Sequence, residues 1–409
     1  MFESTPLNPP DSIFGLNEEF KADSREQKVN LTVGVYQDES GRTPLMRAVA
    51  EAEKRLVADG GNKSYLPIDG LPGYNARIGN LIFGNELRPV GEGGSFHCGE
   101  INCSTAQTPG GTAALRVSGD MLHKLLGARR IWISNPTWAN HKNIYTAAGL
   151  EIVPYEYLDE GGTGLDFERM ISSLAEAKPG DGILLHTVCH NPTGVDLAQE
   201  NWQTLFELIR EKNLLPVFDF AYQGFGTGIE EDASPIRQFC SAGGEALIAN
   251  SFSKNFGLYG ERVGGITAVA GTPEAARAAQ SQIKAIIRRT WSNPPKHGGT
   301  IVNTVLGDPE LRSVWEAELG EMRDRIKDLR IQFVEAVNGI TPDHDFQYVT
   351  RQVGMFSYSG LQPEQVARLK EEFAIYALGT GRINIAGLNS ANLANVSEAI
   401  ATVMSNAVA

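Results

Sequence analysis

The chain has 409 residues, of which 42% are hydrophobic and 21% are charged, and its formal net charge at pH 7 is −13. Such a chain can bury one sizeable core and a smaller second one. The negative charge disfavours binding to nucleic acid or to an anionic membrane surface, so an anionic ligand would have to be met by locally placed arginines.

The N-terminal segment and the apolar runs predict a cytoplasmic protein. The first 20 residues contain no arginine and no basic segment followed by an apolar one, so we expect neither a secretory signal nor a mitochondrial transit peptide. No apolar run approaches the roughly 18 residues that a membrane span requires. The four cysteines lack the spacing of a disulfide framework, and we expect them to be reduced.

Two glycines and a threonine stand at the start of a predicted helix. The segment Thr108-Pro109-Gly110-Gly111-Thr112 precedes a helical pattern whose apolar positions are 114, 117, 121, 122 and 125. Backbone N–H groups and the helix dipole at such a start favour a phosphate. An ordinary glycine-rich turn explains this segment equally well.

Short apolar runs alternate with helical patterns between about residue 105 and residue 270. This alternation predicts strands joined by crossover helices, and hence an α/β fold with a mostly parallel central sheet. Active sites of such sheets gather at the carboxyl ends of the strands. The runs are 131–133, 151–153, 182–185, 214–218, 246–249 and 265–269.

The run 182–185 is followed by the turn His190-Asn191-Pro192-Thr193-Gly194, whose residues favour a turn and place the Asn191 amide at the edge of the sheet. His186 and His190 have the spacing of metal ligands. However, they lie at a strand end and in a turn rather than on one helix, so we expect no metal site.

Asp219 ends the run 214–218, where a carboxylate is costly unless it has a partner. A protonated pyridine nitrogen would be such a partner, and capping of the next turn is the alternative. Tyr222, three residues later, could donate a hydrogen bond to the phenolate oxygen of the same ring.

Lys254 follows the run 246–249 within Ser251-Phe252-Ser253-Lys254. A lysine at the end of a buried strand can lose its solvation, which lowers its pKa and lets the amine condense with a carbonyl. Ser251-x-x-Lys254 also fits the motif of penicillin-recognising serine acyl enzymes. Neither Lys-Thr-Gly nor Ser-Asp-Asn accompanies it, so a Ser-x-x-Lys hydrolase is a remote alternative.

A long helix is predicted at about 309–338. Asp308 is a suitable N-cap, Pro309 suits the first helical position, and apolar residues recur as far as Val337. This helix would reach roughly 40 Å and link a large domain to a small one. The remaining residues predict a strand at 355–358 and helices after Pro363 and Ser390.

Together these motifs resemble the class I, fold-type I pyridoxal phosphate aminotransferases, and within them the aspartate and aromatic amino acid subgroup. The resemblance extends from Gly34 to Arg382. It implies a fold-type I transferase whose helix-flanked large domain is joined to a smaller α+β domain built from both chain ends. The implied division is 1–44 for the N-terminal arm and first part of the small domain, 45–321 for the large cofactor-binding domain and 322–409 for the remainder of the small domain.

The resemblance also implies roles around pyridoxal 5′-phosphate. Lys254 would bind the cofactor covalently and then move a proton between the substrate Cα and the cofactor C4′. Asp219 would pair with the pyridinium nitrogen, with His141 and His186 behind it. The phenolate oxygen would be bound by Asn191 and Tyr222, and the ring would be stacked by Trp138.

The phosphate group would be bound from two subunits, which implies a homodimer with shared active sites. One subunit would bind the phosphate through Gly111, Thr112, Ser251, Ser253 and Arg262. The partner subunit would contribute Tyr65.

The resemblance implies that the substrates are amino acids and 2-oxo acids. Arg382 would bind the α-carboxylate beside Gly34, Trp138, Asn191 and Phe356, and Arg288 of the partner subunit would meet a distal carboxylate. Transfer from aspartate to 2-oxoglutarate, giving oxaloacetate and glutamate, is therefore expected, with some activity on aromatic amino acids.

Two alternatives concern the reaction itself. Aromatic members of the family retain the arginine at position 288 and move it aside, so a primarily tyrosine or phenylalanine aminotransferase stays open. Another pyridoxal phosphate reaction, such as that of a lyase or decarboxylase, would use the same Lys254, Asp219 and Asn191. The pair of substrate-binding arginines favours transamination.

Overall fold

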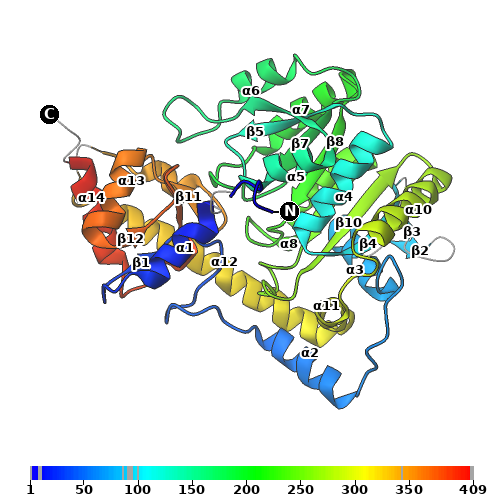
Figure 1. The fold of residues 1–409 in the computed structure, drawn as a ribbon, viewed down its shortest axis with the longest axis horizontal. Helices are drawn as coiled ribbons and strands as arrows, with labels where there is room; N and C mark the ends of the chain where they lie inside the picture. The colour runs from blue at the N-terminus through cyan, green and yellow to red at the C-terminus, as the bar shows by residue number, and fades with distance from the viewer. Residues whose placement is uncertain are drawn as a thin grey trace.

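The structure is a computed structural model, which describes residues 2–7, 12–84, 87–89, 95–98, 101–341 and 344–405. Its largest sheet has the strand order β2-β3-β4-β10-β9-β8-β7-β5-β6 (Figure 1). These strands are β2 (Arg88–Pro89), β3 (Ser95–Cys98), β4 (Ile101–Pro109), β5 (Arg130–Asn135), β6 (Glu151–Glu156), β7 (Gly182–His186), β8 (Leu215–Phe220), β9 (Ala246–Ser251) and β10 (Val263–Ala270).

Helices flank this sheet on both faces, as expected for an α/β fold. The helices between residues 47 and 307 are, in chain order, α2 (Arg47–Ala58), α3 (Pro72–Phe83), α4 (Gly111–Lys124), α5 (Asn140–Ala148), α6 (Phe167–Leu174), α7 (Gln199–Glu211), α8 (Ile229–Asp232), α9 (Ser234–Ser241), α10 (Pro273–Thr290) and α11 (Lys296–Gly307). Leu125 does not belong to the buried face of α4, because the helix ends at Lys124 and Leu125 is exposed.

The direction of one predicted strand differs from the expectation. Strands β5 to β9 pair in parallel, whereas β10 runs antiparallel to both β9 and β4. The connection between β9 and β10 covers only residues 252–262 and contains no helix. A parallel pair needs a longer crossover, so the chain must return in the opposite direction.

Side-chain alternation along the strands divides the core between the two faces of the sheet. Val217 packs in a cluster with α4 and α10, whereas its neighbour Phe218 packs on the opposite face with α7 and α9. Side chains two residues apart share a face. Asp219 therefore points to the face that carries α4, and His186 does so by the same rule from Leu184.

The second, smaller structural region combines segments from both parts of the chain. Strand β1 (Val29–Asn30) pairs in parallel with β12 (Ile375–Tyr376), and β11 (Phe356–Tyr358) pairs antiparallel with β13 (Arg382–Asn384). Its other elements are α1 (Ser12–Ala22), η1 (Gln347–Arg351), α13 (Pro363–Phe373), η2 (Ile385–Gly387) and α14 (Leu393–Ser405). The domain limits at residues 44 and 321 stay a prediction.

Helix α12 (Pro309–Asn338) has the predicted extent and connects the two regions. It runs from α11 and α2 to α14, in yellow in Figure 1. Asp308 caps it, since its Oδ1 accepts hydrogen bonds from the N–H groups of Glu310 (2.9 Å) and Leu311 (3.1 Å). Among the helices of the described ranges, none has the length and apolarity to cross a lipid bilayer.

Trp315 fixes the first half of α12 to the large region. Its buried indole stacks on Phe256 with ring centroids 4.7 Å apart, and Nε1 donates a 2.7 Å hydrogen bond to the Asn255 carbonyl oxygen. The residue that it anchors directly follows Lys254, so the helix and the loop after β9 form one unit.

We expect Trp315→Phe to lower the free energy of unfolding by roughly 1–3 kcal/mol, because it keeps an aromatic ring but leaves a buried carbonyl without its donor. Trp291→Phe is the matched control, since the Trp291 Nε1 has no hydrogen-bond partner within the described residues. Denaturant unfolding of both variants measures the difference. Equal losses in the two variants would contradict the role given to the indole hydrogen bond.

Candidate active site

The side chains that could do chemistry meet at the carboxyl ends of β7, β8 and β9. Asp219 lies near the end of β8, and Lys254 lies in the turn after β9, closed by a 3.1 Å hydrogen bond from the Gly257 N–H to the Lys254 carbonyl oxygen. The N-terminus of α4 follows β4 beside them, because Gly111 packs on Ser251 at the end of β9. This is the edge at which ligands bind in sheets of this kind.

A hydrogen bond from His141 keeps the buried Asp219 ionised. The atoms His141 Nε2 and Asp219 Oδ2 are 2.9 Å apart, and His141 Nδ1 is 2.8 Å from Thr137 Oγ1. Burial raises the pKa of Asp219, but this hydrogen bond and the positive charge of Lys254 outweigh it, and the pKa lies below its ordinary value. With Nε2–H donating to the carboxylate, Nδ1 accepts from the threonine hydroxyl.

Thr137 is a site residue that the sequence analysis missed. Thr137 stands four residues before His141, in the segment that leads into α5. Its hydroxyl therefore reaches the ring nitrogen of His141, which lies in the first turn of the helix. The signal that could have found it is this spacing, once His141 had been placed next to Asp219.

His186 and His190, which have the sequence spacing of metal ligands, do not form the group of side chains best placed to bind a metal. His190 is engaged elsewhere, with Nε2 2.9 Å from Ser134 Oγ and Nδ1 2.8 Å from Thr193 Oγ1. Ligand atoms of His141, His186 and Asp219 do lie within 4.8 Å of one another. However, the His141–Asp219 hydrogen bond already uses two of these atoms, and this group supplies three ligands where structural zinc takes four.

Lys254 carries an amine whose pKa is lowered to about 8. Burial is the main cause, Asp219 opposes it, and the positive charges of Arg262 and Arg382 add to the lowering. The side chain is half-buried, and Nζ lies 5.1 Å from the centroid of the Tyr222 ring. About a tenth of this amine is therefore neutral, and so nucleophilic, at pH 7, and about half at pH 8.

A cradle for an anion lies at the N-terminus of α4. A Cβ at Gly110 would lie 2.4 Å from an Arg262 guanidinium nitrogen, and one at Gly111 would lie 3.1 Å from the Ser251 Cβ. Arg262 donates to Ser253 Oγ at 3.4 Å, and Ser251 Oγ donates to Ser253 Oγ at 3.2 Å. With Thr112 in the first helical turn, the predicted phosphate-binding residues of one chain come together here.

Arg382 offers a second anion site on the side of the smaller region. It is 2% exposed, and its guanidinium carbon lies 4.2 Å from the centroid of the Phe356 ring. It donates to the Thr32 carbonyl oxygen and, at 3.4 Å, to Asn191 Oδ1. Its Nε has no hydrogen-bond partner within the described ranges, so a donor of this buried cation is left for a ligand.

Gly34 and Trp138 lie beside these groups. A Cβ at Gly34 would lie 2.6 Å from the Phe356 Cζ, so the backbone reaches the aromatic ring only because glycine is present. The Trp138 ring contacts His141 edge-on, with centroids 5.2 Å apart. Buried Tyr222 keeps its hydroxyl proton, because burial raises its pKa.

Tyr65 and Arg288 are the predicted site residues that the single chain does not bring to this group. Tyr65 is 92% exposed, and exposed Arg288 donates to Ser292 Oγ. The two lie in the same region of the surface, since Asn293 Nδ2 donates a 2.7 Å hydrogen bond to the Leu66 carbonyl oxygen. This common exposure is what residues that act in a partner subunit would show.

Comparison with known proteins gives the family. The model of the class I and II aminotransferases matches residues 26–400. An aspartate aminotransferase of Escherichia coli is 48% identical over 99% of this chain and 100% of its own length, and an aromatic-amino-acid aminotransferase of the same organism is 43% identical with the same coverage. The chain belongs to the class I and II aminotransferase family.

Solved structures agree with this assignment. An aromatic-amino-acid aminotransferase from Burkholderia pseudomallei, covalently bound to pyridoxal phosphate, has a TM-score of 0.93 and 46% identity, covering 98% of this chain and 99% of that one. The expected fold-type I transaminase of the aspartate and aromatic subgroup is thus confirmed, and the Ser-x-x-Lys hydrolase alternative is wrong. Ser251 ends a strand and faces the helix N-terminus instead.

The residues present fit pyridoxal phosphate. The cradle around Gly110 matches a phosphate in charge, the ionised Asp219 matches a protonated ring nitrogen, and the amine of Lys254 has the lowered pKa that condensation with an aldehyde requires. The cofactor expected from the sequence is confirmed by the family and by the solved relative.

The rate at which cofactor-free protein binds pyridoxal phosphate should rise about tenfold per pH unit below pH 8 and level off above it, since only the neutral amine of Lys254 reacts. Growth of the visible absorbance band in stopped-flow mixing measures this rate. Lys254→Ala should show no band. A rate that still rises steeply up to pH 10 would show that the amine has an ordinary pKa.

Proposed function

We propose that this aminotransferase moves the amino group of aspartate to 2-oxoglutarate, giving oxaloacetate and glutamate, and accepts aromatic amino acids as secondary substrates. The observation that carries the proposal is the combination of two arginines, the exposed Arg288 and the buried Arg382, whose Nε has no partner among the described residues. Two carboxylates on one substrate match these two cations. The identity to curated aspartate aminotransferases supports the same choice.

Each residue of the site then has a distinct task. Bound pyridoxal phosphate supplies an electron sink for the pair left on the substrate Cα. Lys254 Nζ accepts the proton from Cα and returns it at the other end of the reacting system. Its pKa near 8 suits both directions of transfer, since an amine with an ordinary pKa would rarely be free to accept a proton.

Asp219 and Tyr222 keep the electron sink effective. The ionised carboxylate of Asp219 would pair with a protonated ring nitrogen, and the His141 hydrogen bond keeps the carboxylate ionised. The Tyr222 hydroxyl, which burial keeps protonated, and the Asn191 amide are proposed to donate to the phenolate oxygen.

Arg382 orients the substrate before the proton moves. Its planar guanidinium can bind the α-carboxylate through two parallel hydrogen bonds, while Phe356 covers its face. Because Asn191 contacts Arg382 directly, the carboxylate and the cofactor ring are held by neighbouring groups. Trp138 and the Gly34 backbone are proposed to complete the walls that exclude water.

We also propose a cytoplasmic homodimer whose active sites are shared. The exposure of Tyr65 and Arg288 supports it, because each side chain belongs to the predicted site and lies outside it in one chain. Tyr65 would reach the phosphate and Arg288 the distal carboxylate of the neighbouring subunit. The division into domains at residues 44 and 321 is part of the same proposal.

A primarily aromatic enzyme is the second candidate. It is favoured by the structural match to aromatic enzymes, including one from Psychrobacter with a TM-score of 0.94 and 40% identity over 99% of this chain and 100% of that one. The exposed side chain of Arg288, which donates to a serine hydroxyl, is free to move aside for an uncharged ring. Turnover of aspartate, phenylalanine, tyrosine and tryptophan with 2-oxoglutarate, measured side by side, decides between the two.

Arg288→Ala should lower kcat/KM for aspartate, because a charged hydrogen-bonded pair is lost. The loss corresponds to a rise of roughly 1.5–3 kcal/mol in the free energy of the transition state. Phenylalanine has no distal carboxylate, so its kcat/KM should change little. Arg289→Ala, at the neighbouring exposed arginine, is the control and should affect neither substrate. Equal losses on both substrates in Arg288→Ala would remove Arg288 from the proposed site.

Hybrid dimers test the sharing of sites. A hybrid of one Lys254→Ala chain and one Arg288→Ala chain should have about half the wild-type activity on aspartate, because one of its two sites receives an intact Lys254 and an intact Arg288. The parent variants should both be nearly inactive on aspartate. If Arg288 acted within its own chain, the hybrid would be as inactive as its parents.

A further inference from the structure

Arg330 is a completely enclosed cation that the proposed reaction does not use. It lies in the second half of α12 and is 2% exposed. Its guanidinium donates to the carbonyl oxygens of Phe356 (2.6 Å), Gly354 (2.7 Å) and Val349 (3.4 Å), and to Ser357 Oγ. All four acceptors lie within residues 349–357, so one side chain connects three backbone carbonyl groups and one hydroxyl group of this segment.

The segment held by Arg330 separates two groups of the proposed site. On one side, the Val353 N–H donates a 2.7 Å hydrogen bond to the carbonyl oxygen of Gly194, in the turn that carries Asn191. On the other side, Phe356 and Tyr358 pair with β13, where Tyr358 is the register partner of Arg382. A shift of the segment would therefore move Arg382 relative to Asn191.

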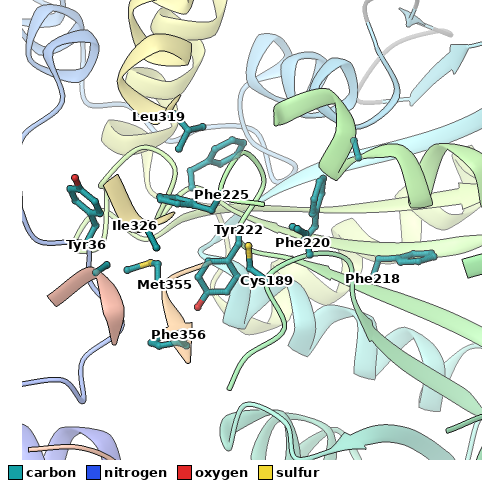
Figure 2. Close-up of a cluster of buried hydrophobic side chains, with 14 of the residues drawn as sticks. Tyr36, Cys189, Phe218, Phe220, Tyr222, Phe225, Leu319, Ile326, Met355 and Phe356 are labelled. Atoms are coloured by element: carbon teal, nitrogen blue, oxygen red, sulfur yellow. The ribbon is translucent and has the colours of Figure 1, made fainter. Parts of the chain in front are cut away.

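The segment and the turn also touch without any space between them. A Cβ at Gly194 would lie 2.5 Å from the Phe356 carbonyl oxygen, and one at Gly354 would lie 2.5 Å from the Cys189 Cβ. Both glycines have positive φ, 70° and 77°. Figure 2 shows the result, with Met355 and Phe356 on one side of this junction and Tyr222 and Cys189 on the other.

Asp196 fixes the turn on the other side of the junction from Arg330. The Asp196 carboxylate accepts hydrogen bonds from the N–H groups of Cys189 (2.7 Å) and His190 (2.8 Å), which fixes the chain just before Asn191. Burial lowers the pKa of Arg330 only to about 10, so the guanidinium stays charged at neutral pH.

We infer that Arg330 is a positioning residue, which holds the segment 349–357 so that Arg382 and Phe356 keep their places relative to Asn191. The inference rests on the proposed function, because it takes Arg382 as the ligand of the substrate α-carboxylate. A planar guanidinium with five donors can serve four acceptors spread over the segment, whereas the ammonium group of lysine has three donors and no fork.

The role inferred for Arg330 concerns the α-carboxylate of the substrate, whereas the role proposed for Arg288 concerns the distal carboxylate. The α-carboxylate is common to every amino acid and 2-oxo acid substrate. A change in the position of Arg382 relative to Asn191 therefore weakens the binding of every substrate by the same factor. Loss of a ligand for the distal carboxylate weakens the binding of dicarboxylic substrates only. The ratio of aspartate to phenylalanine activity separates the two cases.

The test uses the complete holoenzyme carrying Arg330→Lys. We expect KM for aspartate and for phenylalanine to rise by the same factor, about tenfold, with a smaller change in kcat. The Kd of succinate, a dicarboxylate without an amino group, should rise similarly in calorimetry. Arg312→Lys is the matched control, because Arg312 lies on the same helix in a solvent-exposed pair with Glu316 and should leave all three constants unchanged.

A purely structural role predicts a different pattern. A lower Tm for Arg330→Lys with KM and the Kd of succinate within twofold of the wild-type values would overturn the inference. A loss confined to aspartate would overturn it as well. If Arg330→Lys does not fold, Ser357→Ala removes one acceptor and leaves the guanidinium in place. It should raise KM for both substrates equally, by about threefold, and unchanged values would again overturn the inference.

Arg382→Lys distinguishes failure of this inference from failure of the proposed function. The proposed function requires this variant to raise the same constants at least as much as Arg330→Lys does. If Arg382→Lys raises them and Arg330→Lys does not, only the positioning role of Arg330 is wrong. If Arg382→Lys leaves them unchanged, the assignment of the α-carboxylate site is wrong and this inference falls with it.

Discussion

The hydrogen bond between His141 and Asp219 is the interaction on which the rest of the site depends. A carboxylate at the end of a buried strand would ordinarily take up a proton, and this one stays ionised because a histidine donates to it from the start of α5. The charge of Asp219 limits how far the pKa of Lys254 falls, because it opposes burial and the positive charges of Arg262 and Arg382. The aspartate thus sets the electrostatic balance of the catalytic lysine as well as that of the cofactor ring.

Helix α12 transmits the geometry of one region to the other. Near its start, Trp315 holds the residue after Lys254, and further along, Arg330 holds the segment beside Arg382. Both contacts are hydrogen bonds from buried side chains to backbone carbonyl oxygens, which fix position more strictly than apolar packing does. One helix about thirty residues long therefore positions both the groups that bind the cofactor and the groups that bind the substrate.

Sequence alone located the reactive groups well and their supporting contacts poorly. Lys254 and Asp219 could be proposed because each follows an apolar run, and the N-terminus of α4 could be proposed because glycines and a threonine precede a helical pattern. The bounds of α12 were found because Asp308 and Pro309 are strong start signals. The direction of β10 was missed because the length of the connection, and not the pattern of the strand, determines it.

Arg330 shows why the rest could not be predicted. In a helix rich in arginine and glutamate, a cation at one position has the same local signature whether it faces water or four backbone acceptors nearby. Only long-range contacts, between residues up to 27 positions apart, distinguish the two cases. Thr137 and Thr193 are similar, because a threonine hydroxyl that orients a histidine has no pattern of its own.

The row of rings behind Asp219 has a consequence for the charge that the carboxylate meets. The ring of His186 lies between those of His141 and His190, at centroid distances of 5.1 and 4.3 Å, and its nitrogens have no partner within the described residues. Burial lowers the pKa of His186 to about 3, so this ring stays neutral at physiological pH. The side of Asp219 that faces His186 therefore carries no second cation, and the charge of the carboxylate is left for a protonated cofactor ring.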